Sequence, residues 1–341
     1  MKIINKAISV ILAATLGVSL TGCKSEKESE KVIRIGSPTA DATALVENAG
    51  FALSLGYIEE ELSKTGYKVE LVGFGQGGTA INEALSSNQV DAAFVGDIPS
   101  IIAKSSGLDI EVVANLNNAS GMGIIVGNSS DISSPEELKG KKIVVAFGTT
   151  TYVYLVRLLS EYGMTIDDVE LINDIANGGP LVASGDADAV VSTLAGVIGY
   201  RDAGVGKILV TTSEDDAVKA VSQFYFYGNK SYIDKNEDAV KAIIRALIRS
   251  KEKAETDPDA TYKALATADK GAEVWENIYP RESGFDFFEP YITDKDKEYY
   301  DSTAKLLLDS NVITKEIHAA DFFTNKYTEA VYKELGKDLP Q

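Results

Sequence analysis

The sequence predicts an α/β protein of two similar lobes, each built on a mostly parallel β-sheet. Short apolar segments alternate with helical segments along most of the chain, which is typical of parallel sheets. Several apolar segments end in a turn rich in Gly, Ser or Thr that leads directly into a helix. Residues 90–97 and 187–193 also share one pattern: an Asp near the strand start, small and β-branched residues, then a polar turn. The two halves therefore look like versions of one α/β unit.

The N-terminus is typical of an exported lipoprotein. Lys2 and Lys6 precede or flank an apolar run at residues 7–20, which suits a signal peptide and is short for a membrane span of about twenty residues. The run ends in Leu-Thr-Gly-Cys, which resembles the bacterial lipoprotein box. We expect residues 1–22 to be a signal peptide and Cys23, the only cysteine, to be acylated. An ordinary buried thiol is the alternative for Cys23.

The charge of the chain limits its partners. Residues 23–31 carry almost only Lys, Ser and Glu and are predicted to be a flexible tether. We therefore expect an extracytoplasmic protein that touches the cell membrane only through its lipid anchor. The formal net charge of −18 argues against nucleic acid as a partner, because phosphate backbones require clustered Lys and Arg. An anionic ligand would have to be held by local dipoles, since the overall field would not attract it.

The first lobe is predicted from strands that end in polar turns. Val, Ile and Leu are frequent in the expected strands, which are residues 32–36, 68–72, 90–95 and 110–114. The turns that lead into helices are residues 37–41, 73–78 and 96–99, and the second of these helices is expected at 79–85. Residues 115–121 are polar, so we interpret them as an irregular crossover that precedes a strand at 122–126.

The central segment of the second lobe is the strongest candidate for a binding site. A buried strand at residues 143–146 is followed by a tight turn at Gly148 and a helix that continues to about residue 159. Three threonines, Thr149, Thr150 and Thr151, stand where this helix begins and where its first N–H groups have no intrahelical acceptor. Such a turn can bind an anionic or strongly polar small molecule. The simpler alternative is that Thr149 or Thr150 is only an N-cap.

The rest of the chain completes both lobes. Ser134 begins a helix-start signature, and the further expected strands are residues 169–172, 187–191, 207–211 and 222–227, with a turn at 177–180. The aromatic run at 224–227 is more typical of a core than of a ligand platform. The expected helices that close the first lobe are residues 237–256, 258–266, 294–308 and 319–335. The predicted division is residues 32–117 and 225–341 for the first lobe and 118–224 for the second.

Several of these segments resemble one family, the solute-binding lipoproteins of ABC importers in the aliphatic-sulfonate, taurine and nitrate class. The resemblance runs from about residue 32 to residue 327, and its matching segments are residues 32–36, 75–77, 90–99, 138–150, 292–294 and 320–323. It implies a periplasmic-binding-protein type II fold, in which two crossover segments join the lobes. It also implies a monomer that captures a small-molecule solute in the cleft and delivers it to a membrane permease with its ATPase. No cofactor, no metal and no enzymatic activity are implied.

The resemblance also assigns candidate ligand contacts. The family places them in the turns that correspond here to Pro38, Thr39, Ala40, Gln76, Gly77, Gly78, Gly96, Asp97, Gly148, Thr149, Thr150, Thr151, Tyr152, Ser192 and Thr193. Many relatives carry a Trp-Asp-Pro-like sequence where this chain has Ser-Thr-Leu-Ala at residues 192–195. This departure leaves the ligand class open and suggests a smaller or less aromatic contact from the second lobe.

Three of these residues have a plain structural alternative. Asp97 could accept a hydrogen bond from an amine or hydroxyl of the ligand, or it could cap the following helix. Gln76 could present its amide to the ligand or lie in an ordinary surface turn, and Tyr152 could close the cleft or only pack. A helix terminus contributes about 0.3 to 1 kcal/mol, whereas micromolar binding needs about 8 kcal/mol. Side-chain hydrogen bonds and cleft closure must therefore supply most of the affinity.

Other functions remain as alternatives. The same fold could bind an aromatic or heterocyclic nutrient such as a pyrimidine vitamin precursor. Gly73, Gly75 and Gly78 formally match the dinucleotide motif G-x-G-x-x-G, but they follow the second strand of the chain and not the first. The single histidine, His318, argues against a site with several His ligands and is interpreted as a surface residue. A purely structural or adhesive lipoprotein is the third alternative.

Overall fold

The computed structural model describes residues 31–43, 45, 48–75, 77–174, 177–212, 222–266, 271–281 and 284–340. Lys31–Gln341 forms one compact unit. The expected signal peptide and Cys23 lie outside the described residues, as do Gln76 and all of the expected tether except Lys31. Among the helices of the described part, none combines the length and the apolar character that crossing a membrane requires.

The first sheet contains five strands in the order β2-β1-β3-β10-β4. Their bounds are Lys31–Ser37 for β1, Tyr67–Gly73 for β2, Ala92–Gly96 for β3, Ile110–Ser120 for β4 and Ser222–Asn229 for β10. Strand β1 is parallel to β2 and β3, whereas β10 is antiparallel to β3 and β4.

The second sheet repeats this arrangement in the order β7-β6-β8-β5-β9. Its strands are Met122–Gly127 (β5), Lys142–Val144 (β6), Glu170–Ile172 (β7), Ala189–Thr193 (β8) and Gly206–Thr211 (β9). Strand β6 is parallel to β7 and β8, and β5 is antiparallel to β8 and β9. The α/β class and the repeat of one unit are therefore confirmed. Both sheets are mixed, because the strand that arrives from the other sheet, β5 or β10, runs against its neighbours.

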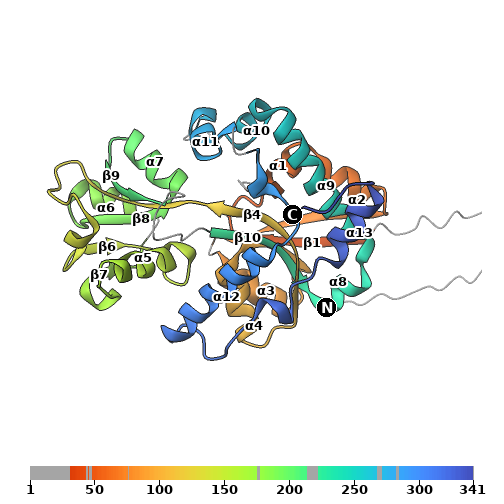
Figure 1. Cartoon of the computed structure of the whole chain (residues 1–341), viewed down its shortest axis with the longest axis horizontal. Helices are drawn as coiled ribbons and strands as arrows, with labels where there is room; N and C mark the ends of the chain where they lie inside the picture. The colour runs from red at the N-terminus through yellow and green to blue at the C-terminus, as the bar shows by residue number, and fades with distance from the viewer. Residues whose placement is uncertain are drawn as a thin grey trace, which may run out of the picture. The chain divides into compact units, whose positions relative to one another are not determined.

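Strand β4 corrects one sequence prediction. Residues 115–120, predicted as an irregular passage, continue β4 toward the second sheet (Figure 1). Two Asn residues are buried in this strand, where Asn115 Nδ2 donates to the carbonyl oxygen of Glu289 (2.8 Å) and Asn117 Nδ2 donates to Tyr279 Oη (2.8 Å). Polar residues thus extend the strand because their side chains find partners in another part of the chain. The predicted lobe boundary at residue 117 falls inside this strand, and the division into lobes stays a prediction.

The helices divide between the two sheets (Figure 1). The helices of the first sheet are α1 (Asn48–Ser54), α2 (Tyr57–Ser63), α3 (Gly78–Ser86), α4 (Asp97–Ser105), α8 (Lys230–Lys235), α9 (Glu237–Thr256), α10 (Pro258–Leu265), α11 (Ala272–Ile278), α12 (Asp294–Asp309) and α13 (Lys326–Glu334). The helices of the second sheet are α5 (Thr150–Glu161), α6 (Gly178–Ser184) and α7 (Leu194–Asp202). We call the first sheet with its helices the first half, and the second sheet with its helices the second half.

The predicted helices agree with the structure in part. Helix α9 has the predicted bounds, and the helix-start signature at Ser134 is confirmed by a capping box with Glu137 at the 3₁₀ turn Pro135–Leu138. The turn predicted at residues 177–180 is wrong, because α6 begins there. The single helix predicted at 319–335 is also wrong. A 3₁₀ turn ends at Asp321, after which Phe322 and Phe323 leave the helical path and pack on Tyr300.

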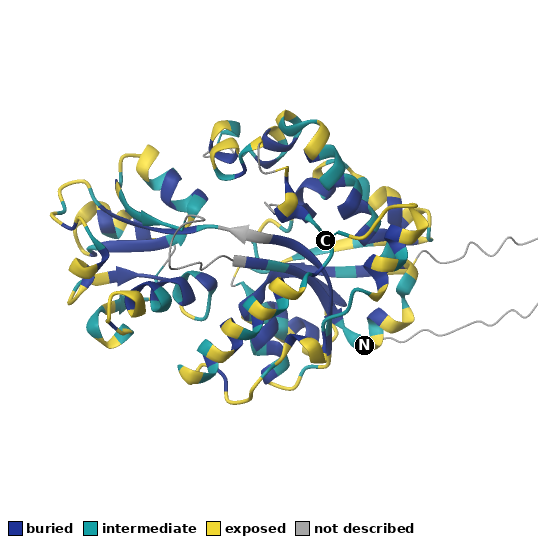
Figure 2. Cartoon of the chain, viewed as in Figure 1, coloured by how far each residue is buried: buried dark blue, intermediate teal, exposed yellow. Residues whose placement is uncertain are grey.

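The cores lie along the strands, while exposed residues cover the outward faces of the helices (Figure 2). In the first half, Ile33 and Phe94 pack on Phe226 and on the buried face of α9. The aromatic run of β10 is core, as predicted, since Tyr225, Phe226 and Tyr227 are all buried. Tyr225 also belongs to a buried polar network that leads to the candidate site.

Candidate functional site

Three predicted turns of the first half lie together where β1, β2 and β3 end. At Gly73 a Cβ atom would lie 2.5 Å from the carbonyl oxygen of Ala40, so the second turn packs directly on the first. At Gly78 a Cβ atom would overlap the ring of Pro99, which brings the second turn against the third. Two glycines of the dinucleotide-like motif are thus explained by close packing between turns.

The first turn is held by its own hydrogen bonds. The hydroxyl of Thr39 donates to the carbonyl oxygen of Asp41 (2.6 Å) and is hydrogen-bonded to the hydroxyl of Ser37 (2.8 Å). Pro38 and Thr39 are half-buried, and Ala40 is exposed. In the second turn, Gly77 has a φ of 75° and is the N-cap of α3, while Gly78 begins that helix. The structure shows these roles in the turns, and ligand contact by Pro38, Thr39, Ala40, Gly77 and Gly78 remains a prediction.

The turn before α5 has the geometry that its sequence predicts. Gly148 has a φ of 68°, which a residue with a side chain rarely adopts, and a Cβ atom added there would meet nothing within 4 Å. Thr149 holds the N-cap position, but its hydroxyl donates to the carbonyl oxygen of Ala146 (2.6 Å) and is hydrogen-bonded to that of Thr151 (2.8 Å). The hydroxyl of Thr149 therefore organises the turn itself and makes no capping hydrogen bond to the residues of α5, all of which the structure describes.

Asp97 and Thr150 join the two halves. The hydroxyl of Thr150, at the start of α5, donates to Asp97 Oδ1 (3.0 Å), at the start of α4. The same carboxylate oxygen accepts from the backbone N–H of Ile98 (2.9 Å). Gly96, and not Asp97, holds the N-cap position of α4.

The environment of Asp97 is unusual for a carboxylate. Its side chain is fully buried, and within the described residues its second oxygen, Oδ2, has no hydrogen-bond partner. Burial raises the pKa of Asp97 to about 6, against the opposing effect of the hydrogen bonds from Ile98 and Thr150. A desolvated carboxylate with one oxygen unpaired is costly, and such groups gather at functional sites.

A small space bounded by oxygen atoms lies next to Asp97. A Cβ atom on Gly96 would lie 3.7 Å from the carbonyl oxygen of Gln223 and 4.0 Å from Thr150 Oγ1. The buried Gln223 accepts a hydrogen bond from Tyr225 Oη (2.8 Å) and donates to the carbonyl oxygen of Asp296 (3.4 Å). Gly96 thus leaves room at a point where both halves present oxygen atoms.

Helix α5 also contacts the first half along its length. Arg157 Nη2 donates to the hydroxyls of Ser302 and Thr303 on α12 (3.1 Å each), and its guanidinium lies 4.8 Å from the ring centroid of Tyr299. Val153 is buried among the apolar residues of the first half. Spacings of three and four residues place Thr150, Val153 and Arg157 on one face of the helix, which docks on α4 and α12.

The remaining predicted residues have local roles in the structure. Ser192 and Thr193 are the last residues of β8, and Thr193 is also the N-cap of α7. The hydroxyl of Thr193 accepts a hydrogen bond from the backbone N–H of Gly196 (3.2 Å). Because β6 and β8 are parallel neighbours, their carboxyl ends lie at the same edge of the second sheet. The ring of Tyr152 packs against that of Phe147, with centroids 5.8 Å apart, which agrees with the packing alternative for Tyr152.

Sequence analysis missed several residues of this region. Gln223 directly precedes the aromatic run in a strand that the sequence predicts to be core. A polar residue in such a strand indicates a buried hydrogen-bond network. Ser100 donates to the carbonyl oxygen of Asp97 (2.7 Å) and is hydrogen-bonded to the hydroxyl of Tyr300 (2.8 Å). Arg157 could have been found from its spacing to Thr150. Phe147 is 47% exposed beside Gly148, and its exposure is visible only in the structure.

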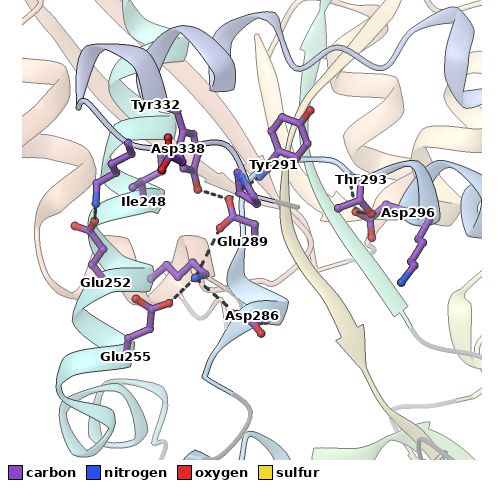
Figure 3. Close-up of a pocket in the computed structure, with 14 residues that line it drawn as sticks. Ile248, Glu252, Glu255, Asp286, Glu289, Tyr291, Thr293, Asp296, Tyr332 and Asp338 are labelled. Carbon is purple, nitrogen blue, oxygen red and sulfur yellow. Dashed lines mark hydrogen bonds and ion pairs between the residues drawn. The ribbon is translucent and has the colours of Figure 1, made fainter.

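A cavity of about 730 Å³ lies elsewhere in the first half (Figure 3). Its walls come from α9, residues 286–296 and the C-terminal segment, and acidic side chains outnumber basic ones. Lys251 forms ion pairs with Glu255 (2.5 Å) and Glu289 (3.7 Å), and burial raises the pKa of Glu289. None of the predicted turns lines this cavity, and its excess of carboxylates is unfavourable for an anion. Among the described residues, no group of three His, Cys, Asp or Glu is placed to hold a metal ion.

Comparison with known proteins agrees with the predicted family. The family model described as NMT1/THI5 like matches residues 51–261. The chain belongs to the NMT1/THI5-like family. It is 31% identical over 150 residues to a protein of Bacillus subtilis (strain 168) named as aliphatic sulfonates-binding, and 26% identical over 203 residues to the taurine-binding periplasmic protein of Escherichia coli (strain K12). The matches cover 43% and 58% of this chain, and 43% and 61% of these two relatives.

Solved structures confirm the predicted periplasmic-binding-protein fold. The periplasmic sulfonate-binding protein SsuA of Methylobacillus flagellatus KT has a TM-score of 0.77 and 24% identity, covering 92% of this chain and 98% of that one. SsuA of Xanthomonas axonopodis pv. citri, solved with MOPS, has a TM-score of 0.71 and 20% identity, covering 86% and 98%. The desulfurization enzyme DszB, at a TM-score of 0.63 and 16% identity, covers 89% and 99%. Binding proteins and an enzyme thus share this fold, so the fold by itself does not separate the two roles.

Proposed function

We propose that this protein is the extracytoplasmic solute-binding component of an ABC importer. It captures a small polar solute between its two halves and delivers it to a permease with its ATPase. The observation that carries the proposal is the contact at Thr150 and Asp97, where the first turns of α5 and α4 meet beside Gly96. Closure of two halves around a ligand is a common hinge motion, and β4 and its neighbour β10 are the strands that would bend.

The solute is proposed to be a sulfonate, taurine, nitrate or a similar polar molecule. Two named relatives bind aliphatic sulfonates or taurine. The first turns of α4 and α5 offer backbone N–H groups that no intrahelical bond uses, and the hydroxyls of Thr149 and Thr151 lie beside them. These groups can bind an oxyanion without a basic side chain, which agrees with the net charge of −18.

An aromatic or heterocyclic nutrient is the second candidate. The exposed ring of Phe147, packed on Tyr152, lies immediately before Gly148 and could stack on a flat ligand. Aliphatic and heterocyclic solutes therefore belong in the same binding screen.

The experiment that tests the proposal is a thermal-shift screen of the purified protein, followed by calorimetry. Sulfonates, taurine, nitrate, amines and pyrimidine vitamin precursors form the panel. A ligand that binds only the folded state should raise Tm. If no compound in a broad panel stabilises the folded protein, the binding role is wrong.

A pair of glycine variants tests the position of the site. In Gly96→Ala the new methyl group would occupy the space beside Asp97 at ordinary contact distances, so the variant should fold and lose ligand binding. The matched control is Gly127→Ala in the second half, where a Cβ atom would also meet only ordinary contacts, at 3.6 Å or more. If Gly96→Ala binds a confirmed ligand as tightly as the control does, the site lies elsewhere.

Export and lipid anchoring are a separate part of the proposal. In the lipoprotein-box interpretation, Cys23→Ser removes the acylated atom, so the full chain should lose its lipid label and leave the membrane fraction. A Cys23→Ser protein that stays with the membranes would contradict the anchor and leave the binding role untouched.

A further inference from the structure

We infer that Asp97 binds a protonated amine of the solute, which makes the solute class zwitterionic, with an ammonium group at one end and an oxyanion at the other. This inference rests on the proposed function and adds to it the charge of the solute and the residue that recognises it. It starts from the buried carboxylate oxygen of Asp97 for which the described part of the chain holds no donor.

The atoms nearest to the space at Gly96, beside Asp97, are oxygen atoms that can accept hydrogen bonds. The space at Gly96, the residue directly before Asp97, is bounded by the carbonyl oxygen of Gln223 and by Thr150 Oγ1. An ammonium group has three donors and no acceptor, so it matches such a set better than an anion or a neutral acceptor does. A nitrate or a simple alkanesulfonate would place negative charge beside a carboxylate.

Among the residues that the structure describes, no side chain near Asp97 already supplies this donor. Arg157 is the cation whose charge acts on Asp97, but its Nη2 donates to Ser302 and Thr303 on α12. Tyr225 donates its hydroxyl hydrogen to Gln223. A buried carboxylate is stabilised when it is paired, so a ligand cation would remove the cost of the unpaired oxygen.

The anionic end of the solute has a different place. Helix α5 has twelve residues, and its first turn, with Thr149 and Thr151, lies within a few residues of the Thr150–Asp97 contact. The positive end of its dipole favours an oxyanion there. The two ends of the site therefore prefer opposite charges, as a short zwitterion such as taurine does.

The charge of the whole chain supports the same class. A net charge of −18 repels a monoanion during approach, whereas a zwitterion has no net charge and is not repelled. A zwitterion can thus reach the anion-binding turn of α5 in a strongly acidic protein.

The test compares two probes that differ only in the amine: taurine and ethanesulfonate. Isothermal titration calorimetry at pH 7.5 should show taurine binding at least about tenfold tighter, the usual effect of a hydrogen bond to a charged group. In Asp97→Asn the affinity for taurine should fall by about tenfold or more, while that for ethanesulfonate should stay within about twofold. The control is Asp294→Asn, which makes the same change at a side chain that is 93% exposed and should alter neither affinity.

Each outcome decides the inference. Equal affinity of the unmodified protein for both probes would overturn it, and so would an equal loss of both affinities in Asp97→Asn or no binding of either probe. Because the first comparison needs no variant, a folding defect of Asp97→Asn cannot hide the answer. Tight binding of ethanesulfonate, abolished by Gly96→Ala, would leave the proposed function standing and refute only the amine. Absence of binding across the whole solute panel would refute the proposed function itself.

Discussion

At the residue scale, Asp97 shows why a binding site can be costly for the unliganded fold. Burial raises its pKa from 3.8 to about 6. The hydrogen bonds from Ile98 and Thr150 and the charge of Arg157 lower the pKa but offset burial only in part. Burial keeps the neighbouring Tyr225 and Tyr300 neutral by raising their pKa values. Ionised Asp97 is therefore less favourable in the folded protein than in the unfolded chain.

The first prediction is a pH dependence of stability. Well below pH 3.8 the carboxyl is protonated in both states and costs nothing. As the pH rises from about 4 to about 6, the unfolded chain ionises before the folded protein does, so the folded protein loses up to about 3 kcal/mol, and the loss is complete above about pH 6. Asp97→Asn has no such proton, so the stability of the unmodified protein relative to this variant should fall between pH 4 and pH 7. Urea unfolding at several pH values measures the difference, and a constant difference would contradict it.

Gly78 gives the second prediction at this scale. A methyl group in Gly78→Ala would overlap the rigid ring of Pro99, so the turns after β2 and β3 would have to separate. We expect a loss of about 1 to 3 kcal/mol in the free energy of unfolding. Gly96→Ala is the matched control, because its φ of −64° and open contacts accept a methyl group. Equal stability of the two variants would contradict this account.

The sequence could indicate these residues but not their partners. A Thr-rich turn after a strand was recognisable, and so was an acid after a glycine at the end of β3. That Thr150 donates to Asp97 depends on how α5 docks on the first half, since 53 residues separate the two along the chain. Gln223 escaped notice for the same reason, because its role depends on Tyr225, Asp296 and Gly96 coming together.

At the element scale, buried Asn residues tie the helices of the first half together. Asn48, in α1, donates to the carbonyl oxygens of Leu247 (3.1 Å) and Phe288 (2.7 Å) and accepts from Ser250. One fully buried side chain thus joins α1 to α9 and to the segment before α12.

The third prediction is that Asn48→Ala strongly weakens this half. The change removes three buried hydrogen bonds, although the hydroxyl of Ser250 still donates to the carbonyl oxygen of Leu247 (2.9 Å), so the free energy of unfolding should fall by about 2 to 4 kcal/mol. The control is Asn128→Ala, which removes one exposed hydrogen bond to Gly204 and should cost less than about 1 kcal/mol. Denaturant unfolding measures both values, and similar losses would contradict the role of Asn48.

Elements with an apolar pattern were predictable, and elements fixed by distant partners were not. Helix α9 was predicted because its apolar residues recur on one face that covers the sheet. The end of β4 was mistaken for a loop because Asn115 and Asn117 look like loop residues until their partners, Glu289 and Tyr279, are known. The helix predicted at 319–335 is interrupted at Phe322 and Phe323, whose rings pack on Tyr300 in another part of the chain.

At the scale of the whole molecule, the two sheets have one topology. In each sheet four strands run in one direction and one runs against them, and this opposed strand is the fourth in the order and arrives from the other sheet. The similarity of residues 90–97 and 187–193 anticipated this symmetry, since these segments form β3 and β8 at equivalent positions. The symmetry brings the turns of both sheets toward a shared boundary, which α5 crosses through Thr150 and Arg157.

The last prediction concerns that boundary. Arg157 connects α5 to α12 through Ser302 and Thr303 and through the ring of Tyr299, so Arg157→Ala removes three contacts between the halves without removing core volume. We expect the halves to separate more readily, with a larger radius of gyration in small-angle X-ray scattering.

A confirmed ligand should restore the radius of gyration of Arg157→Ala, but with an affinity reduced by about threefold to tenfold, because part of its binding free energy must then close the halves. Arg201→Ala is the control, since this arginine pairs with Asp202 on α7, within the second half. If the two variants scatter alike and bind alike, α5 is packed on the first half without controlling closure. The affinity of the site would then depend on the turns at Gly96 and Gly148 alone.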